Sequence, residues 1–318
     1  MKVAIGAFSL DEINYCIDWV GDWENLCIAN SIEFKGFDSF DPDFIDKLLA
    51  YNPDATLWRS GNIPHKKIKD EMQRQFLDKT NLRILPNWRT HYIYDHKIRQ
   101  SYLFEYHNIP HPETKVFFSE SYALEYIEKA EYPFVVKADG GAGGRSFRFI
   151  ETKEQALVRV NEAFGGRGRI TGREHEKNIL YVQEYIAATQ IWRIGVFKNK
   201  VGFGFIQKNK LETKVASYRG VKVYPPVPAP LLNMALEINQ RMEWDWMMYD
   251  FIWSEKYGEY LVLEITDTCD TGGPAGRSLT YYREGDKWIS KKKTPPPQEI
   301  IFNLFILEKM RLKERLVT

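Results

Sequence analysis

The sequence has few cysteines, and their positions already narrow the class of protein. Its 318 residues include only Cys16, Cys27 and Cys269, with no close pair and no histidine cluster beside them. An odd, scattered set predicts reduced thiols, with neither a disulfide framework nor a zinc site. We therefore expect a cytoplasmic protein.

Net charge and long apolar runs are also lacking. Forty-four basic residues balance forty-three acidic ones, which leaves a formal net charge of +1. No global charge favours nucleic acid or an acidic membrane, so any anion site must be local. No apolar run approaches the length of a bilayer, and the chain opens on a strand pattern without the apolar stretch of a signal peptide. We expect neither a nucleic-acid partner nor a membrane partner.

The first 94 residues alternate short apolar runs with helical patterns. The expected strands are 3–7, 25–29, 55–58 and 83–85, and the expected helices are 12–19, 44–51 and 68–77. This alternation is typical of a small three-layer α/β domain with a parallel sheet. The polar loop 59–62 would follow a strand, where open α/β sheets bind ligands, although an ordinary glycine turn is the favoured interpretation.

A glycine-rich hairpin is expected over residues 132–150. Gly140, Gly141, Gly143 and Gly144 fill four of five consecutive positions between two apolar runs. Lys137 ends the first run, and Arg145 and Ser146 open the second. Glycine lets backbone N–H groups approach phosphate oxygens closely, so the segment outlines a phosphate clamp; the alternative is a flexible hairpin tip. It matches neither a Walker A loop nor a dinucleotide-binding fingerprint.

Two further segments could meet a nucleotide. Asp95 is a plausible N-cap for a helix that runs towards Tyr106, and Lys97 in its first turn is either a surface charge or an anion ligand. The short strand 180–186 could offer adenine a backbone donor and acceptor between apolar walls, or it is simply a core strand.

The most informative pair of residues is Asp250 and Glu264. They lie in two apolar runs joined by a loop near Tyr257, and a hairpin symmetric about Tyr257 would place them opposite each other. Facing carboxylates among apolar strands repel, and a divalent cation removes that conflict. Oxygen ligands without His or Cys indicate Mg²⁺ or Mn²⁺. The alternative is a partly exposed hairpin edge that tolerates both acids.

The rest of the chain gives weaker signals. The polar loop 266–277 supplies Asp267 and Arg277 as candidates for holding a second substrate, whereas Cys269 has no evident base and is read as incidental. Lysines 291–293 and the prolines after them read as a solvated linker. A helix over 298–316 is apolar around most of its circumference, which predicts burial against the body of the protein or a second subunit.

Taken in order, these motifs resemble the ATP-grasp superfamily, and most nearly its branch similar to ribosomal-protein S6:glutamate ligase. The resemblance covers roughly residues 85 to 270. It implies an α/β protein with α+β lobes, in which a pre-ATP-grasp α/β domain precedes the ATP-grasp fold. The expected domains are 1–94 (pre-ATP-grasp), 95–185 (central lobe with the glycine loop), 186–290 (C-terminal lobe with the metal site) and 291–318 (linker and helix).

The same resemblance implies roles for individual residues. Lys97 and Lys137 would bind the phosphates of ATP, and Gly140, Gly141, Gly143, Gly144, Arg145 and Ser146 would close over them. Glu184 and Ile186 would present backbone groups to adenine, with Tyr185 beside the ring. Arg193 and Lys208 would contact the γ-phosphate and the acyl phosphate. Asp250 and Glu264 would hold magnesium.

Two positions depart from the family's pattern. Thr266 stands where an asparagine is usual, two residues after the bridging glutamate, and we expect Asp267 or water to complete the metal coordination. The acidic residue usual before the arginine is missing, because Thr189, Gln190 and Ile191 occupy that stretch.

The resemblance implies a cytoplasmic, ADP-forming ligase that joins a carboxylate to an amine through an acyl phosphate, on small-molecule or peptide substrates and with a homodimer as one arrangement. Two alternatives stay open, namely a phosphotransferase that stops at a phosphorylated small molecule and a nucleotide-binding module without catalysis.

Overall fold

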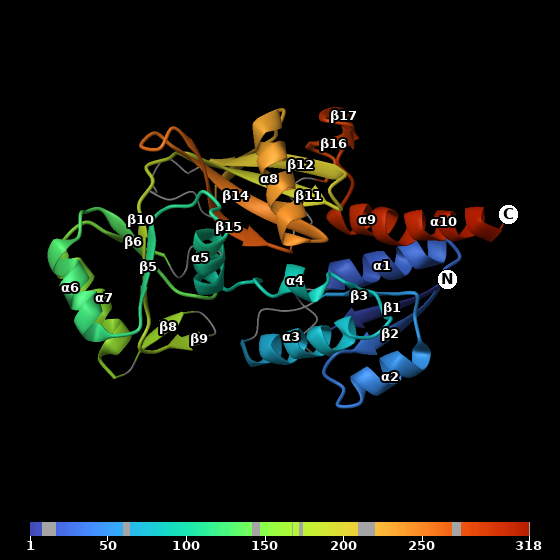
Figure 1. The fold of residues 1–318 in the computed structure, drawn as a ribbon, viewed down its shortest axis with the longest axis horizontal. Coiled ribbons are helices and arrows are strands. Elements are labelled where there is room, and N and C mark those ends of the chain that lie inside the picture. The colour runs from blue at the N-terminus through green and yellow to red at the C-terminus, as the bar shows by residue number, and fades with distance from the viewer. Residues whose placement is uncertain are drawn as a thin grey trace.

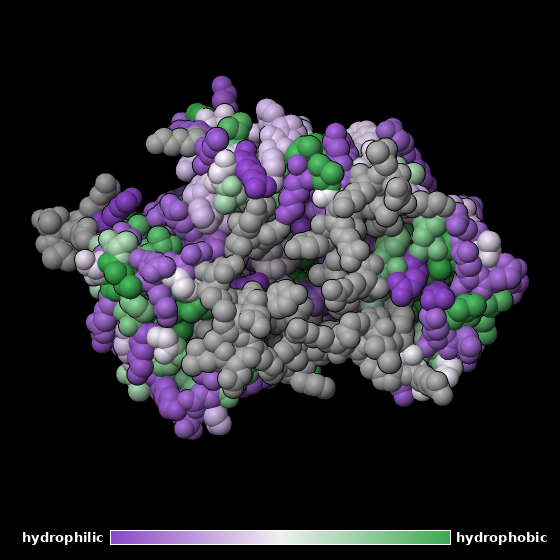
Figure 2. All heavy atoms as spheres, turned by 180° about the vertical axis from the view of Figure 1, so that it is seen from behind, coloured by the Kyte–Doolittle hydropathy of each residue, from purple (hydrophilic) through white to green (hydrophobic). Residues whose placement is uncertain are grey.

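The computed structural model describes residues 1–7, 17–59, 64–141, 147–166, 168–171, 174–208, 220–268 and 275–317. Within these ranges the chain forms two four-stranded sheets, a seven-stranded sheet and a small two-stranded sheet. Figure 1 shows a small lobe at one end, an N-terminal α/β unit at the other, and the largest sheet above them. On the face in Figure 2, hydrophilic and hydrophobic side chains alternate in small groups over the described surface.

The N-terminal unit is a parallel sheet between helices. Its elements are β1 (Lys2–Ala7), α1 (Ile17–Ala29), β2 (Glu33–Asp38), α2 (Phe44–Tyr51), β3 (Ala55–Trp58), α3 (Pro64–Asp78) and β4 (Ile84–Leu85). The strand order is β2-β1-β3-β4, with every pairing parallel. Val3 and Ile5 join a cluster with α1, whereas Ala4 joins a second cluster with α2, so both faces of β1 are covered. The predicted three-layer arrangement is confirmed.

One predicted strand of this unit is wrong. Residues 25–29 lie in α1, where Trp19, Trp23 and Cys27 are all buried at a spacing of four residues. That spacing is the period of a helix face, and it overrides the local apolar run. β2 was not predicted from the sequence, because only Phe37 of its six residues is buried and no clean alternation marks it.

The small lobe is an antiparallel sheet with two helices on one face. Its main elements are β5 (Thr114–Phe117), α6 (Glu120–Lys129), β6 (Phe134–Lys137), β7 (Arg148–Ile150), α7 (Lys153–Phe164) and β10 (Leu180–Glu184), in the strand order β5-β10-β6-β7. β8 (Arg169–Thr171) pairs with β9 (Glu174–Glu176) beside it. Helices α6 and α7 cover the outer face, as Figure 1 shows. The predicted glycine hairpin is confirmed, because β6 and β7 pair in antiparallel.

The largest sheet carries the C-terminal half of the chain. Its elements are β11 (Gln190–Phe197), β12 (Val201–Lys208), β13 (Val221–Val223), α8 (Ala229–Met242), β14 (Trp246–Ser254), β15 (Glu259–Thr266), β16 (Leu279–Glu284) and β17 (Lys287–Lys293). The order is β15-β14-β11-β12-β16-β17, and β13 pairs with β12. Ile194 and Val196 join the cluster that contains the buried residues of α8. Because side chains alternate along a strand, Arg193 points to the opposite face.

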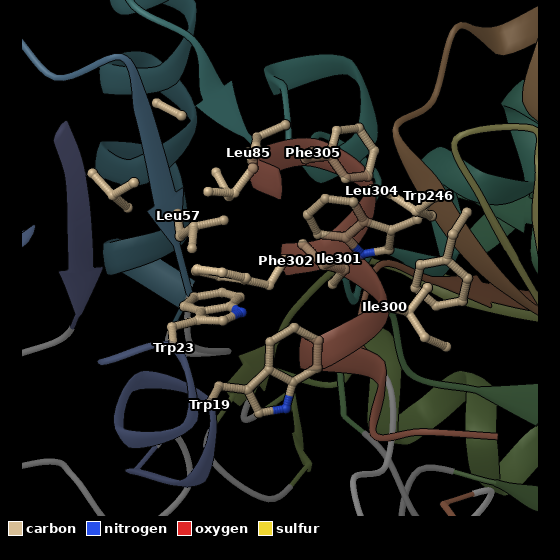
Figure 3. Close-up of a cluster of buried hydrophobic side chains, with 14 of the residues drawn as sticks. Trp19, Trp23, Leu57, Leu85, Trp246, Ile300, Ile301, Phe302, Leu304 and Phe305 are labelled. Atoms are coloured by element: carbon tan, nitrogen blue, oxygen red, sulfur yellow. The ribbon is translucent and has the colours of Figure 1, made fainter. Parts of the chain in front are cut away.

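The C-terminal helix lies between the N-terminal sheet and the largest sheet and packs against both. It consists of α9 (Pro297–Phe302), a π-helical turn (Asn303–Leu307) and α10 (Glu308–Val317). Figure 3 shows Phe302 beside Leu57 and Trp23 on one side, and Phe305 beside Trp246 on the other. Both neighbours belong to this chain, which explains the apolar circumference of α9 and of the π-helical turn, whereas Leu312 of α10 is exposed.

Lysines 291–293 are not the predicted linker. They continue β17, which pairs with β16 through Lys293 opposite Leu279. Cross-strand bonds to β16 thus override the polar composition that suggested a solvated connection. None of the helices in the described ranges is both long and apolar enough to cross a membrane.

Candidate active site

Two carboxylates face each other at the centre of the candidate site. Asp250 of β14 is paired directly with Glu264 of β15, as predicted, and a bulge follows between Asp250 and Phe251. Their side chains are 17% and 36% exposed, so a ligand can reach both. Burial raises the pKa of Asp250, and the nearby charge of Glu264 adds to the rise against the opposing effect of Arg193. Like charges in a recess of this kind favour a bound cation.

Three cations surround the pair. The Nε atom of Arg193 lies 2.6 Å from Oδ1 of Asp250, on the neighbouring strand β11. The Nζ atom of Lys97 lies 3.3 Å from Oε1 of Glu264. Burial raises the pKa of Glu264, but Lys97, Lys137 and Arg193 outweigh it, and the net shift is downward. Asp95 and Asp139 also act on Lys97, so acidic and basic groups are interleaved around the pair.

Lys137 is the most perturbed of these cations. It ends β6, is buried, and donates to Oε1 of Gln183 at 2.6 Å. Burial lowers the pKa of Lys137 to about 8, and the positive charge of Lys97 acts in the same direction. Because burial disfavours the charged form of Lys137, a bound phosphate would stabilise that form. The structure therefore supports an anion-binding role.

The first residues of the glycine loop are fastened to the start of α5 (Lys97–Tyr106). Gly141, at φ 93°, donates its N–H to Oδ1 of Asp95 at 2.9 Å, and its carbonyl accepts from Nζ of Lys97. Asp139 accepts from the N–H of Ile98 at 2.8 Å. The two halves of the predicted phosphate site, 97 and 137–141, are thereby brought together. Gly143, Gly144, Arg145 and Ser146 lie outside the described residues.

The predicted N-cap of α5 is wrong by one residue. His96 occupies the cap position without a side-chain capping bond, while Asp95 has a positive φ of 52°. The carboxylate of Asp95 turns to Gly141, and Asp139 from the glycine hairpin satisfies the helix terminus instead. Sequence reasoning missed Asp139, although its place directly before the glycines was a usable signal.

The strand predicted to meet adenine connects the small lobe to the largest sheet. Glu184 ends β10, and its N–H donates to the carbonyl of Glu113. Its two carboxylate oxygens are bound by Lys256 at 2.6 Å and by the hydroxyl of Tyr257 at 2.9 Å. The ring of Tyr185 packs edge-on against Phe149. Ile186 follows, half-buried, between the two sheets.

Lys208 is not brought to the carboxylate pair. It ends β12 opposite Gln190, with an exposed side chain. Strand alternation places it on the face of Ile206, opposite to the face of Arg193. Its proposed contact with phosphate stays a prediction.

The prediction that Asp267 is a third metal ligand is not supported. Asp267 is buried, and its Oδ2 lies 2.8 Å from Nδ1 of His91 in α4 (Trp88–His91). It lies in a bend after β15, which ends at Thr266, and its carboxylate is bound to His91. No group of three or more metal-capable side chains occurs among the described residues. Two oxygen ligands remain, and Mg²⁺ commonly binds one or two carboxylates together with substrate phosphates.

Comparison with known proteins finds similar chains that are ligases by name. No family model matches the chain. It is 25% identical over 248 residues to the alpha-aminoadipate–LysW ligase LysX of Saccharolobus solfataricus, across 74% of this chain and 81% of that protein. The D-alanine–D-alanine ligase of Bacillus anthracis superposes with a TM-score of 0.60 at 15% identity, over 84% of this chain and 86% of that one.

A third similar structure is the RimK domain ATP-grasp protein of Sphaerobacter thermophilus. Its TM-score is 0.56 at 17% identity, with 83% of this chain and 90% of that chain covered. The predicted ATP-grasp fold is therefore confirmed, and so is the resemblance to carboxylate–amine ligases.

Proposed function

We propose that this ATP-grasp ligase-like protein uses ATP to join a carboxylate to an amine, with release of ADP and phosphate. The observation that carries the proposal is the placement of Asp250 opposite Glu264, beside three cationic side chains. Phosphoryl transfer is catalysed mainly by positioning and by electrostatic stabilisation, and this arrangement supplies both.

The residues divide into a phosphate side and a metal side. Lys97 and Lys137 would bind the phosphates of ATP beneath Gly140 and Gly141. Asp250 and Glu264 form an oxygen-only pair that fits Mg²⁺ or Mn²⁺. Once bound, such an ion would neutralise charge on the phosphate oxygens. Lys97 contacts Glu264 and so links the two sides.

Arg193 would act at the reacting centre. A substrate carboxylate oxygen attacks the γ-phosphorus, ADP leaves, and an acyl phosphate forms. An amine then attacks the acyl carbon, and phosphate leaves with the former carboxylate oxygen. Arg193, held by Asp250 at 2.6 Å, keeps a fixed positive charge where negative charge develops on the transferred group.

Other predicted contacts complete the proposal. Glu184, Tyr185 and Ile186 would line the adenine site at the junction of the two sheets. Gly143, Gly144, Arg145 and Ser146 would close over the phosphates.

The substrates are proposed by class. The name of the LysX relative gives an amino acid and LysW as its substrates, and the D-alanine ligase joins two amino acids by its title. We therefore propose an amino acid or peptide as at least one substrate. A cytoplasmic location and a homodimer belong to the same proposal. The cytoplasmic location is supported by Cys27, which is a free and buried thiol. Burial raises the pKa of this thiol to about 12.

The test is ATP turnover with Mg²⁺ over pooled amino acids, peptides and sugar acids, with ADP, AMP and phosphate separated by chromatography. We expect ADP and free phosphate only when a carboxylate and an amine are both present, and loss of turnover in Lys137→Ala. Lys115→Ala is a matched control, because Lys115 lies in the same lobe with an exposed side chain.

The other outcomes identify the alternatives. ADP without free phosphate, together with a phosphorylated product, would indicate a phosphotransferase. Stoichiometric ATP binding without turnover over the whole panel would indicate a nucleotide-binding module.

A further inference from the structure

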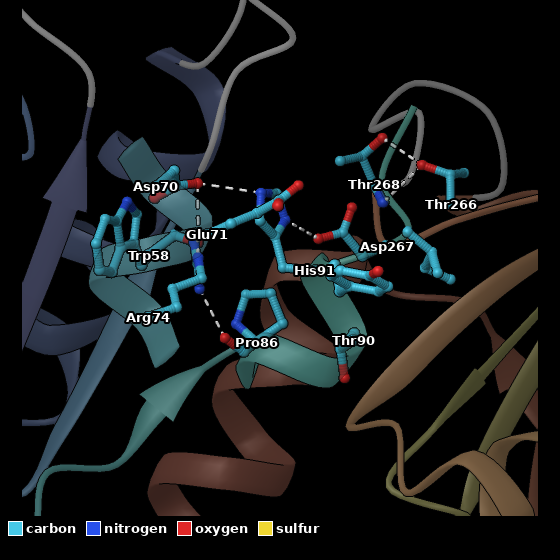
Figure 4. Close-up of polar contacts among 12 residues, drawn as sticks. Trp58, Asp70, Glu71, Arg74, Pro86, Thr90, His91, Thr266, Asp267 and Thr268 are labelled. Atoms are coloured by element: carbon cyan, nitrogen blue, oxygen red, sulfur yellow. Dashed lines mark hydrogen bonds and ion pairs between the residues drawn. The ribbon is translucent and has the colours of Figure 1, made fainter. Parts of the chain in front are cut away.

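A second cluster of charged side chains lies between the N-terminal unit and the end of the metal strand. His91 of α4 stands between Asp70 of α3 and Asp267, which follows β15, as Figure 4 shows. The side chains of His91, Asp70 and Asp267 are 2%, 9% and 4% exposed.

Both ring nitrogens of His91 are used. Nε2 lies 3.0 Å from Oδ2 of Asp70, and Nδ1 lies 2.8 Å from Oδ2 of Asp267. An ionised carboxylate only accepts hydrogen bonds, so the ring satisfies both partners by donating from both nitrogens. A side chain with two donors in one plane holds its partners at a fixed separation.

One end of this cluster is anchored in the N-terminal sheet. Arg74, one turn after Asp70 in α3, donates to the carbonyl of Pro86 at 2.6 Å and to that of Trp58 at 3.1 Å. Its Nε lies 3.6 Å from Oδ2 of Asp70. Trp58 ends β3 and Pro86 follows β4, so the carboxylate of Asp70 is tied to the ends of two strands.

The other end is the last stretch of the metal strand. The pairing of β15 with β14 ends at Thr266, opposite Met248. Beyond Thr266 the chain is held by side chains. Trp246 donates to the carbonyl of Asp267 at 2.7 Å, and His91 binds the carboxylate of Asp267. Asp267 is three residues from Glu264, so whatever holds Asp267 also limits how the end of β15 can rotate.

We propose that His91 is a positioning residue, which transmits the orientation of the N-terminal unit through Asp267 to Glu264 and so sets the affinity of the site for its divalent cation. The proposal rests on the proposed function, because it takes Asp250 and Glu264 as the cation ligands. It accounts for a buried cluster that the phosphate chemistry does not use.

The test is the Mg²⁺ dependence of nucleotide binding by the full chain, with AMPPNP as the probe. In His91→Gln the amide donates to only one carboxylate, and the other is released. We expect the Mg²⁺ concentration for half-maximal AMPPNP binding to rise by about threefold to tenfold. This is less than the roughly 10- to 100-fold cost of losing a hydrogen bond made directly to a metal ligand, because His91 reaches Glu264 only through Asp267. An unchanged concentration would overturn the proposal.

The direction of the shift separates this role from direct coordination. If Asp267 were itself a cation ligand restrained by His91, the release of Asp267 would strengthen cation binding and lower the half-saturating Mg²⁺ concentration. A decrease would therefore also overturn the proposal. Failure of the wild-type chain to bind AMPPNP with Mg²⁺ would instead reject the proposed function.

Two further variants separate positioning from general stability. Thr280→Val removes another buried polar contact, the 3.3 Å hydrogen bond between the hydroxyls of Thr280 on β16 and Thr294. It should lower the melting temperature without changing the Mg²⁺ dependence, and a shift equal to that of His91→Gln would contradict a specific role for His91.

Asp267→Asn keeps the shape of the side chain, and it provides a second test of the proposal if His91→Gln does not fold. It should raise the half-saturating Mg²⁺ concentration, and combination with His91→Gln should add little, because both changes break one contact. A fully additive pair would contradict the proposal.

Discussion

Two clusters of similar composition serve different purposes in this chain. Each has two carboxylates among cationic side chains, with Asp250 and Glu264 in one and Asp70 and Asp267 in the other. The first is partly open, with side chains 17% and 36% exposed. The second is sealed, with its carboxylates 9% and 4% exposed. The difference indicates that exposure, more than residue type, distinguishes a ligand site from a structural joint.

Breaking the sealed cluster should produce the largest loss of stability. Arg74→Met leaves Asp70 buried with less compensation, and removal of one partner from a buried pair costs about 3–5 kcal/mol. We expect urea unfolding to show a loss of that size. Arg159→Met is the control, because Arg159 pairs with Glu162 near the surface of α7 and should cost about 1 kcal/mol or less. Equal losses in the two variants would remove the distinction between the clusters.

A change in the open cluster should reduce function strongly and cost less stability than a change in the sealed one, because Glu264 is 36% exposed and Lys97 keeps its hydrogen bond to Gly141. Glu264→Gln removes one cation ligand and the partner of Lys97, so we expect ligase turnover to fall by about 100-fold or more. Glu259→Gln, an exposed position on the same strand, should keep full turnover. A variant at Glu264 that unfolds as readily as Arg74→Met would show that this acid is structural.

The depressed pKa of Lys137 makes opposite predictions for binding and for stability. Its pKa falls from 10.5 to about 8 in the folded protein. Between these values the unfolded chain binds more protons, so the contribution of Lys137 to the free energy of unfolding should rise with pH. Above about pH 8 the folded protein loses this positive charge, and the affinity for ATP should decline.

Calorimetric titration with AMPPNP from pH 7 to 9.5 measures this decline, and Lys137→Gln should flatten it. The same pH dependence in wild type and in Lys137→Gln would assign the effect to another group.

The smallest effect is expected at the tip of the β14–β15 hairpin. Tyr257→Phe removes one of two side-chain bonds to the half-buried carboxylate of Glu184, and the bond from Lys256 remains. We expect the KM for ATP to change by less than about threefold. Tyr282→Phe, on β16, is a control that should have no effect. A large change in KM would place this tip in the adenine site itself.

The sequence predicted the central pair of the site more reliably than the shape of the hairpin that carries it. Symmetry about Tyr257 placed Asp250 opposite Glu264, and the structure confirms this pairing. However, Phe251 pairs with Val262, so the outer half of the hairpin is shifted by one residue and the bulge restores the expected register. Local patterns do not reveal such a bulge.

The contacts of the sealed cluster could not be predicted from the sequence. Asp70, His91 and Asp267 come from distant parts of the chain, and their contacts arise only when the N-terminal unit docks on the largest sheet. Asp267 was assigned to the metal because it follows Glu264 closely. No local pattern shows that the chain bends after Thr266 and that Asp267 binds His91, because His91 lies 176 residues away.

The most direct test of the account uses a substrate carboxylate labelled with oxygen-18, once turnover has identified it. An acyl phosphate requires one carboxylate oxygen to leave with phosphate, so each amide formed should yield one labelled phosphate, measured by mass spectrometry. Amide and ADP formed without label in the phosphate would contradict the proposed chemistry at Asp250 and Glu264.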